Sequence, residues 1–127
     1  MALTLRIQRE LVSPNQWNGR HWRVKHRISQ EWEQELGWMA LQWLREQREI
    51  AATSRMRLTV TREVPSGRNY IRDDDNLRFC VKPLLDAVKR LGLIKNDSRK
   101  WLELPVPEQR VSLDGQHWTQ IKIEPAE

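Results

Sequence analysis

Apolar residues recur along the chain with two different periods, which limits the folds open to it. They alternate with polar residues in Leu3–Ile7 and again from Met56 to about Val64, and a period of two is typical of half-buried β-strands. Between these segments, apolar residues recur at steps of three and four from about Gln30 to Arg48, which predicts a long amphipathic helix. The first half of the chain therefore predicts the order strand, helix, strand.

The second half of the chain shows the same two periods. Asp73-Asp74-Asp75-Asn76 has the composition of a helix start, an apolar helical face follows, and Gly92 is a typical helix end. Residues from Val111 to Ile123 predict a β-hairpin whose tight turn is Asp114-Gly115. The predicted order is thus β-α-β-α-β-β. It indicates an α+β fold, with one compact domain over residues 1–127 and a small mixed β-sheet packed by two helices.

Length and charge narrow the class of protein. The chain has 127 residues, with 22 Lys and Arg against 17 Asp and Glu, which gives a formal net charge of +5. This length suits one domain, and the positive charge permits a nucleic-acid partner without requiring one. The lone Cys80 excludes a disulfide framework and a cysteine-rich zinc site. Charged residues interrupt the N-terminal segment and no apolar run reaches the length of a membrane span, so we expect a soluble cytoplasmic protein with no membrane partner.

The densest polar cluster is Asp73-Asp74-Asp75-Asn76, and two interpretations of it remain open. One is a helix N-cap with surplus carboxylates, since acidic side chains stabilise the start of a helix. The other is a Mg²⁺ site, because residues two apart in extended backbone face the same way and would bring Asp73 and Asp75 onto one cation. On an uninterrupted helix, Asp75, Lys82 and Asp86 would share one stripe, which is either a solvated face or a site for a phosphate.

Asp97 lies in Asn96-Asp97-Ser98, which is either an ordinary Asx turn or a carboxylate that the fold returns to the helix start. Basic residues surround the acidic cluster, as a nuclease needs in order to hold the phosphates next to the scissile one. We interpret residues 16–27 as a basic loop that is either solvated or binds phosphates. The candidate DNA-binding residues are Arg68 and Arg72 before the cluster, Asn76 within it, and Arg20, Arg23, Lys25 and Arg27 in the loop.

Residues 73–97 carry a longer pattern, which consists of Asp73-Asp74-Asp75-Asn76-Leu77, then Lys82-Pro83-Leu84-Leu85-Asp86-Ala87-Val88, then Gly92-Leu93-Ile94-Lys95-Asn96-Asp97. It resembles the motif of the RusA family of Holliday junction resolvases, which runs D-x-D-N-L, a lysine, D-A-L, then a glycine and an acidic pair. The resemblance extends weakly to Pro14-Asn15 and the basic loop after it. It implies a Mg²⁺-dependent endonuclease that cuts four-way DNA junctions as a homodimer, typically encoded by a phage or prophage.

The resemblance also implies roles for single residues. Asp73 and Asp75 match the two metal ligands of D-x-D, and Asp97 matches a further acidic residue that binds the metal. The metal is expected to be Mg²⁺, with Mn²⁺ as a substitute, and no small-molecule cofactor is implied. Lys82 matches the catalytic lysine, and Arg72 matches a basic residue that contacts DNA.

The sequence departs from the family pattern at two points. Lys82 lies about one helical turn further from Asn76 than in the best-known form of the motif, with Arg78-Phe79-Cys80 as the extra residues. Asn96 stands where the family often has Asp. The displaced lysine leaves open a second function, a branched-DNA-binding protein that does not cut. A third interpretation is a structural protein whose acidic run only caps a helix.

Overall fold

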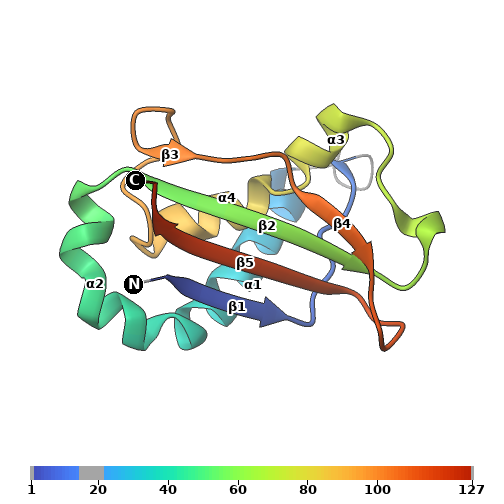
Figure 1. Cartoon of the computed structure of the whole chain (residues 1–127), viewed down its shortest axis with the longest axis horizontal. Coiled ribbons are helices and arrows are strands. Elements are labelled where there is room, and N and C mark those ends of the chain that lie inside the picture. Colours follow the sequence, from blue (N-terminus) through green and yellow to red (C-terminus); the bar gives the residue numbers. More distant parts are fainter. Residues whose placement is uncertain (1, 15–21, 127) are drawn as a thin grey trace.

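The computed structural model describes residues 2–14 and 22–126, which form a mixed five-stranded sheet with helices against it (Figure 1). Strand β5 (Trp118–Pro125) lies between β1 (Leu3–Ile7) and β2 (Met56–Val64) and is antiparallel to both. Two short strands, β3 (Leu102–Glu103) and β4 (Glu108–Val111), follow each other along the other edge of β2 and run parallel to it. The predicted mixed sheet is therefore confirmed.

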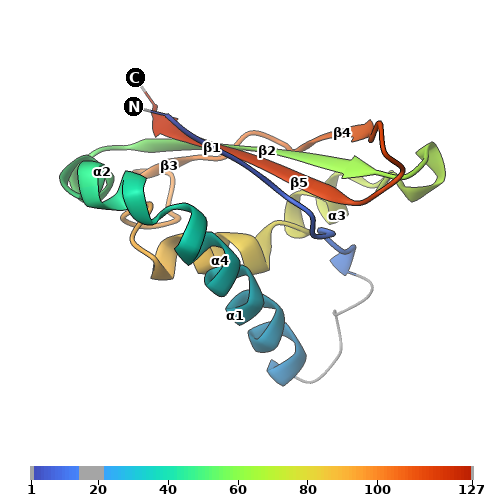
Figure 2. The ribbon, with the colours of Figure 1, turned by 90° about the horizontal axis from the view of Figure 1, so that it is seen from below.

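The helices lie between the strands in the chain and on one side of the sheet in space. Helices α1 (Trp22–Met39) and α2 (Leu41–Thr53) connect β1 to β2. The 3₁₀ helix η2 (Gly67–Asn69), α3 (Asp74–Phe79) and α4 (Lys82–Arg90) connect β2 to β3. Figure 2 shows the sheet edge-on, with α1 and α4 beneath one face and no helix of the described residues over the opposite face. This arrangement confirms the α+β class. No described helix is both long enough and apolar enough to cross a membrane.

The hydrophobic core lies between the sheet and helices α1 and α4. Alternate residues of β2 and β5 face the helices, as the period of two predicts, and the largest of them are almost fully buried. Burying each such side chain stabilises the fold by roughly 1.5–3 kcal/mol. The central core residues are Leu58, Val60, Ile121 and Ile123 from the sheet, Trp32 and Leu36 from α1, and Leu84 and Val88 from α4.

The prediction of one helix over Gln30–Arg48 is wrong in both its start and its continuity. Helix α1 begins at Trp22, because residues 22–27, predicted to be part of a loop, form its first turns. Ser29 lies within α1 and is buried, and its hydroxyl accepts a hydrogen bond from Arg90 of α4 at 3.1 Å. The chain turns at Ala40, where φ is −95° and ψ is −2°, and α2 then continues in a new direction (Figure 2).

The second predicted helix is also divided. It ends at Phe79 and begins again at Lys82, so that Pro83 lies in the first turn of α4. Proline lacks an N–H group, and inside an unbroken helix its ring would also clash with the carbonyl of Phe79. In the first helical turn neither problem arises. The break therefore follows from Pro83.

The hairpin predicted for Val111–Ile123 is wrong, although its turn is present. Gly115 has a φ of +71°, and Asp114 Oδ1 accepts a hydrogen bond from the Gln116 N–H at 3.1 Å, as expected for a tight turn. The strands on either side of the turn, however, pair with opposite edges of β2 and not with each other. The chain therefore crosses the end of β2 between β4 and β5.

Candidate functional site

Asp73 is the N-cap residue of α3. Its backbone is extended, and its Oδ1 accepts hydrogen bonds from the N–H of Asp75 at 2.8 Å and of Asn76 at 3.1 Å. These bonds satisfy two of the N–H groups that the start of a helix leaves without partners. The N-cap interpretation of the acidic run is therefore confirmed. It leaves room for a second role, because Asp73 Oδ2 has no hydrogen bond to a described residue.

The predicted convergence of Asp73 and Asp75 rested on an extended backbone through both residues. Only Asp73 is extended, and Asp75 already belongs to the first turn of α3, so the two-residue spacing does not place both side chains on one side of an extended segment. The Asp75 side chain is 80% exposed, and its Oδ1 lies 3.9 Å from Arg78 Nη1. Asp75 is therefore open to solvent, with only a weak ion pair on the same helix.

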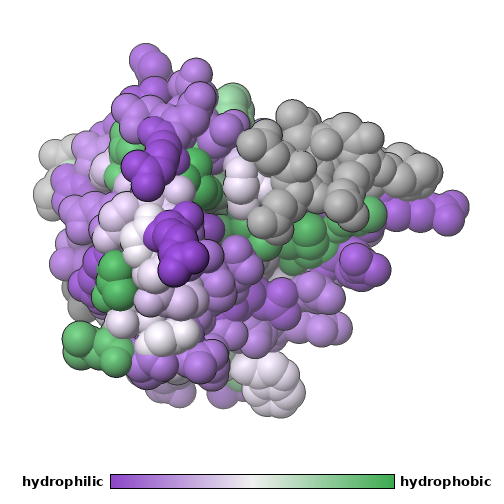
Figure 3. Space-filling view, turned by 90° about the vertical axis from the view of Figure 1, so that its right-hand side faces the viewer, coloured by the Kyte–Doolittle hydropathy of each residue, from purple (hydrophilic) through white to green (hydrophobic). Residues whose placement is uncertain are grey.

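A polar cavity of about 450 Å³ lies beside the start of α3. Two carboxylates, from Glu10 and Asp73, and three guanidinium groups, from Arg62, Arg68 and Arg72, line it. The other lining residues are Ser13, Asn69, Tyr70, Ile71 and Asn76. Figure 3 looks onto this end of the molecule, where the visible surface is mainly hydrophilic. The structure thus brings together Asp73, Asn76, Arg68 and Arg72 of the predicted site residues.

Arg62 is the buried member of this group, with a side chain only 4% exposed. Its Nε donates to the Leu11 carbonyl at 2.7 Å, and its Nη1 donates to the Asn69 carbonyl at 2.7 Å and to Gln109 Oε1 at 3.1 Å. Burial lowers the pKa of Arg62 below its usual value. Arg62 therefore ties the segment after β1, the end of η2 and strand β4 into one wall of the cavity.

Glu10 links the cavity to a histidine. Its Oε2 lies 3.7 Å from Arg62 Nη2, and its Oε1 lies 3.8 Å from His117 Nε2. The other ring nitrogen of His117, Nδ1, is buried without a hydrogen-bond partner among the described residues. Glu10 is thus a second carboxylate of the cavity, contributed by a segment far from the acidic run.

Lys82 lies outside this cavity. The predicted stripe of Asp75, Lys82 and Asp86 is wrong, because the helix is interrupted between the first residue and the other two. Lys82 and Asp86 instead line a separate, smaller cavity of about 110 Å³, together with Pro83 and with Lys25 of α1. The structure therefore separates the proposed catalytic lysine from the cavity beside Asp73.

Asp97 lies at the far end of α4. Figure 1 shows α3 in the right half of the molecule and the chain between α4 and β3 in the left half. Asp97 Oδ1 lies 4.0 Å from Lys89 Nζ in the last turn of α4, and the Ser98 N–H donates to Asn96 Oδ1 at 3.1 Å, as the Asx turn predicts. Within one chain Asp97 is not brought to Asp73, and no three His, Cys, Asp or Glu side chains of the described residues form a metal-binding group.

The candidate DNA-binding residues of the basic segment lie on a helix. Arg23, Lys25 and Arg27 belong to the first turns of α1, where they are spread around the helix by its 3.6-residue period. Arg20 lies outside the described residues. A basic loop is therefore wrong for residues 22–27, and a phosphate-binding role for this segment remains a prediction.

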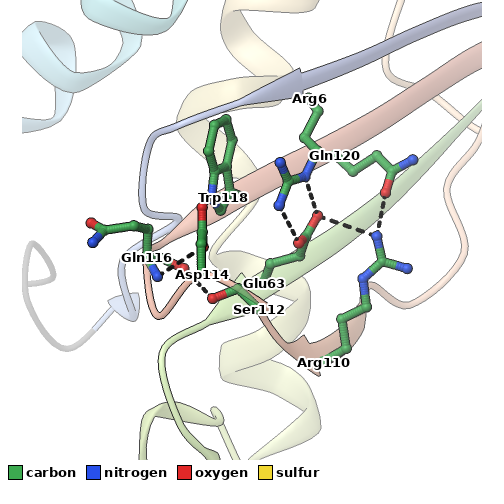
Figure 4. Close-up of polar contacts among 8 residues, drawn as sticks. All are labelled: Arg6, Glu63, Arg110, Ser112, Asp114, Gln116, Trp118 and Gln120. Carbon is green, nitrogen blue, oxygen red and sulfur yellow. Dashed lines mark hydrogen bonds and ion pairs between the residues drawn. The ribbon is translucent and has the colours of Figure 1, made fainter.

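The uncovered face of the sheet carries a separate polar network (Figure 4). Glu63, whose side chain is 4% exposed, accepts hydrogen bonds from Arg6 at 3.0 and 2.9 Å and from Arg110 at 3.2 Å. The Arg6 guanidinium also lies over the Trp118 ring, 3.9 Å from its centroid. The hydrogen bonds from Arg6 lower the pKa of Glu63 below its usual 4.5. Because Arg6 and Arg110 are both bonded to Glu63, this network joins β1, β2 and β4, and these two arginines are not unpaired cations.

Glu10, Arg62 and Tyr70 are among the cavity-lining residues that the sequence motifs did not indicate. Glu10 and Tyr70 stand in segments without a recognisable pattern, so no local signal points to them. Arg62 could have been found, because it continues the inward-facing alternation of Met56, Leu58 and Val60. A charged residue in phase with a buried apolar series indicates a buried, hydrogen-bonded guanidinium.

Comparison with known proteins adds no family assignment. The chain matches no protein-family model and no curated protein. The resemblance to the RusA family therefore rests on the motif in residues 73–97.

Proposed function

We propose that this protein is a metal-dependent DNA endonuclease of the RusA type, which hydrolyses phosphodiester bonds at four-way junctions as a homodimer. One observation carries the proposal. Asp73, the first acidic residue of the motif, shares one cavity with Arg68 and Arg72, whose guanidinium groups have no hydrogen bond or ion pair to any described residue. A carboxylate that binds a cation beside unpaired arginines that bind phosphates is the arrangement that a nuclease requires.

The donors around the cavity suit Mg²⁺, which prefers oxygen ligands and is commonly held by one or two carboxylates together with water and phosphate. Asp73 and Glu10 contribute carboxylates to the cavity, and Asn76 contributes an amide. Asp75 directly precedes Asn76 in α3 and does not line the cavity. When bound, the metal would activate water and offset charge on the phosphate. The arginines of this chain would orient the substrate by binding phosphates next to the scissile one.

The position of Asp97 makes the homodimer part of the proposal. Asp97 lies beside Lys89 in the last turn of α4, whereas Asp73 caps α3, and Asp97 does not line the cavity beside Asp73. Under this proposal, the third carboxylate of the motif comes from the second protomer. A two-fold dimer would also place two such sites against the two-fold symmetric strands of a four-way junction.

A second candidate function is a branched-DNA-binding protein that does not cut. The position of Lys82 favours it, because Lys82 lines the smaller cavity with Asp86 and not the cavity beside Asp73. Without a lysine near the reacting phosphate, the arginines would still bind DNA, but no lysine would offset the charge that develops on the phosphate during cleavage.

Cleavage of a labelled synthetic four-way junction tests the proposal. The wild type is compared in Mg²⁺ and in EDTA with Asp73→Asn and Asp75→Asn, and Asp74→Asn serves as the control because it removes the same charge from the same turn. Asn caps a helix as well as Asp does, so Asp73→Asn keeps the start of α3 intact. We expect paired, symmetric nicks that disappear in EDTA and fall about a hundredfold or more in the two site variants.

The outcomes separate the candidate functions. Junction binding without nicks in Mg²⁺ or Mn²⁺ would favour the non-cutting protein. Absence of junction binding at low salt would refute both candidates, since each needs the arginines to hold phosphates.

A further inference from the structure

The segment Arg68–Arg72 presents a tyrosine between two arginines at the cavity beside α3. Tyr70 is 36% exposed, and Arg68 and Arg72 are both exposed. Neither guanidinium has a hydrogen bond or ion pair to a described residue, whereas Arg6, Arg62 and many other arginines of the chain are paired. Their donors are therefore available to a ligand.

The backbone of this segment is fixed even though its side chains are open. The Asn69 N–H donates to the Ser66 carbonyl at 3.0 Å, and the Tyr70 N–H donates to the Gly67 carbonyl at 3.2 Å. The Asn69 carbonyl accepts from buried Arg62, and both backbone polar groups of Ile71 are bonded to the side-chain amide of Gln109. The segment Arg68–Arg72, called the ledge below, is therefore preorganised, so a ligand would bind it without first ordering its backbone.

The geometry of the ledge indicates the kind of ligand. Tyr70 has an extended backbone, with φ −63° and ψ 137°, and it lines the same cavity as Arg68 and Arg72. An exposed aromatic ring flanked by cations is the arrangement with which proteins hold single-stranded nucleic acid, by stacking a base and binding the adjoining phosphates. A paired base inside a duplex cannot offer its face to the ring, because both of its faces are already stacked.

From this geometry, and resting on the proposed function, we infer that the Arg68–Arg72 ledge binds one unpaired nucleotide of the DNA substrate. The base stacks on the Tyr70 ring, and the phosphates on either side of it contact Arg68 and Arg72. Without a bound cation, the carboxylates of Glu10 and Asp73 within the cavity repel phosphates, so the phosphates that flank the unpaired nucleotide bind at the ledge itself. A cavity of about 450 Å³ is of the size that receives a single small-molecule group and not a duplex.

Equilibrium binding in EDTA tests this inference apart from catalysis. Two fluorescein-labelled DNAs are compared by anisotropy: a continuous duplex, and the same duplex with one unpaired 2-aminopurine nucleotide in its centre. The variants are Tyr70→Ala, Tyr70→Phe, Arg68→Ala and Arg72→Ala. Arg48→Ala is the matched control, because Arg48 is an exposed arginine on α2, on a different element from the ledge.

We expect the wild type to prefer the DNA with the unpaired nucleotide. Tyr70→Ala should lose that preference and weaken binding to the unpaired site by about tenfold to a hundredfold, whereas Tyr70→Phe, which retains the ring, should keep it. Arg68→Ala and Arg72→Ala should each weaken binding to both DNAs and reduce the salt dependence by about one phosphate contact. Arg48→Ala should leave the preference unchanged.

The results distinguish this inference from the proposed function. If Tyr70→Ala binds the unpaired site as the wild type does, or if the wild type shows no preference for it, the inference is overturned even in a protein that cuts junctions. If the preference depends on Tyr70 but no cleavage occurs in Mg²⁺, the ledge stands and the nuclease proposal fails. If the wild type binds neither DNA at low salt, both are overturned.

Discussion

The side-chain amide of Gln109 makes two hydrogen bonds to one residue, Ile71, which lies 38 positions earlier in the chain. Its Oε1 accepts from the Ile71 N–H at 2.9 Å, and its Nε2 donates to the Ile71 carbonyl at 3.0 Å. The same Oε1 also accepts from Arg62 at 3.1 Å. Strand β4 therefore fixes the position of the segment that leads into the acidic motif, although the two are far apart in the sequence.

Replacing Gln109 should loosen this segment. Gln109→Leu leaves the Ile71 amide groups and one Arg62 donor without partners, so we expect the free energy of unfolding to fall by about 1–3 kcal/mol. Gln109→Glu keeps the acceptor but, when ionised, cannot donate to the Ile71 carbonyl, and it should be intermediate. Urea titration measures the stability, and amide hydrogen exchange at Ile71 measures the local opening. Wild-type stability and exchange in Gln109→Leu would show that the contact does not hold the segment.

Glu63 should make the stability of the fold depend on acid. Hydrogen bonds from Arg6 hold the pKa of Glu63 below its usual 4.5, so the unfolded chain takes up a proton at higher pH than the folded one. The contribution of Glu63 is therefore fully present above about pH 5 and is lost as the pH falls through the folded-state pKa. Thermal unfolding from pH 7 to pH 3 should show a smaller acid-induced drop in Tm for Glu63→Gln than for the wild type.

Glu108→Gln is the control for that measurement. Glu108 is exposed, lies on the same sheet as Glu63 and has no ion pair to a described residue. Its variant should follow the wild-type pH profile. If Glu63→Gln also follows it, the acid sensitivity of this protein arises elsewhere.

Cys80 should be unreactive in the folded protein. Its side chain is 1% exposed, its Sγ lies 3.0 Å from the Leu77 carbonyl, and burial raises the pKa of the thiol to about 11. At pH 8 only about one thiol in a thousand would be ionised, and that thiolate would still lack access to a reagent. Reaction with a disulfide reagent should therefore be at least about a hundredfold slower than in urea. Rapid modification of the native protein would contradict this placement.

Gly92 and Gly67 offer a matched test of backbone strain. Gly92 has a φ of +79° at the end of α4, where the Leu93 N–H donates to the Val88 carbonyl and the Gly92 N–H donates to the Lys89 carbonyl. A methyl group at either glycine would meet no atom within 4 Å, so only the backbone differs. We expect Gly92→Ala to destabilise the fold by about 1–2 kcal/mol and Gly67→Ala to be neutral or slightly stabilising. Equal urea midpoints for the two variants would refute this expectation.

The sequence by itself determined the features that depend on a few neighbouring residues. The alternation in β1 and β2 places apolar side chains on one face of each strand, because consecutive strand residues point to opposite faces. The cap at Asp73, the helix end at Gly92 and the turn at Asn96 are equally local, since each needs only one side chain or one backbone conformation.

The tertiary structure alone decided which of these elements meet. The residues that flank Asp114-Gly115 are compatible with two arrangements: the two strands pair with each other, or each pairs with β2 between them. Only the packing of the whole sheet selects the second arrangement. For the same reason, Asp97 follows α4 in the chain yet lies away from Asp73, whereas Glu10, far away in sequence, shares its cavity. Local patterns reflect the geometry of short segments, but a site is assembled by long-range contacts whose free energy depends on the entire core.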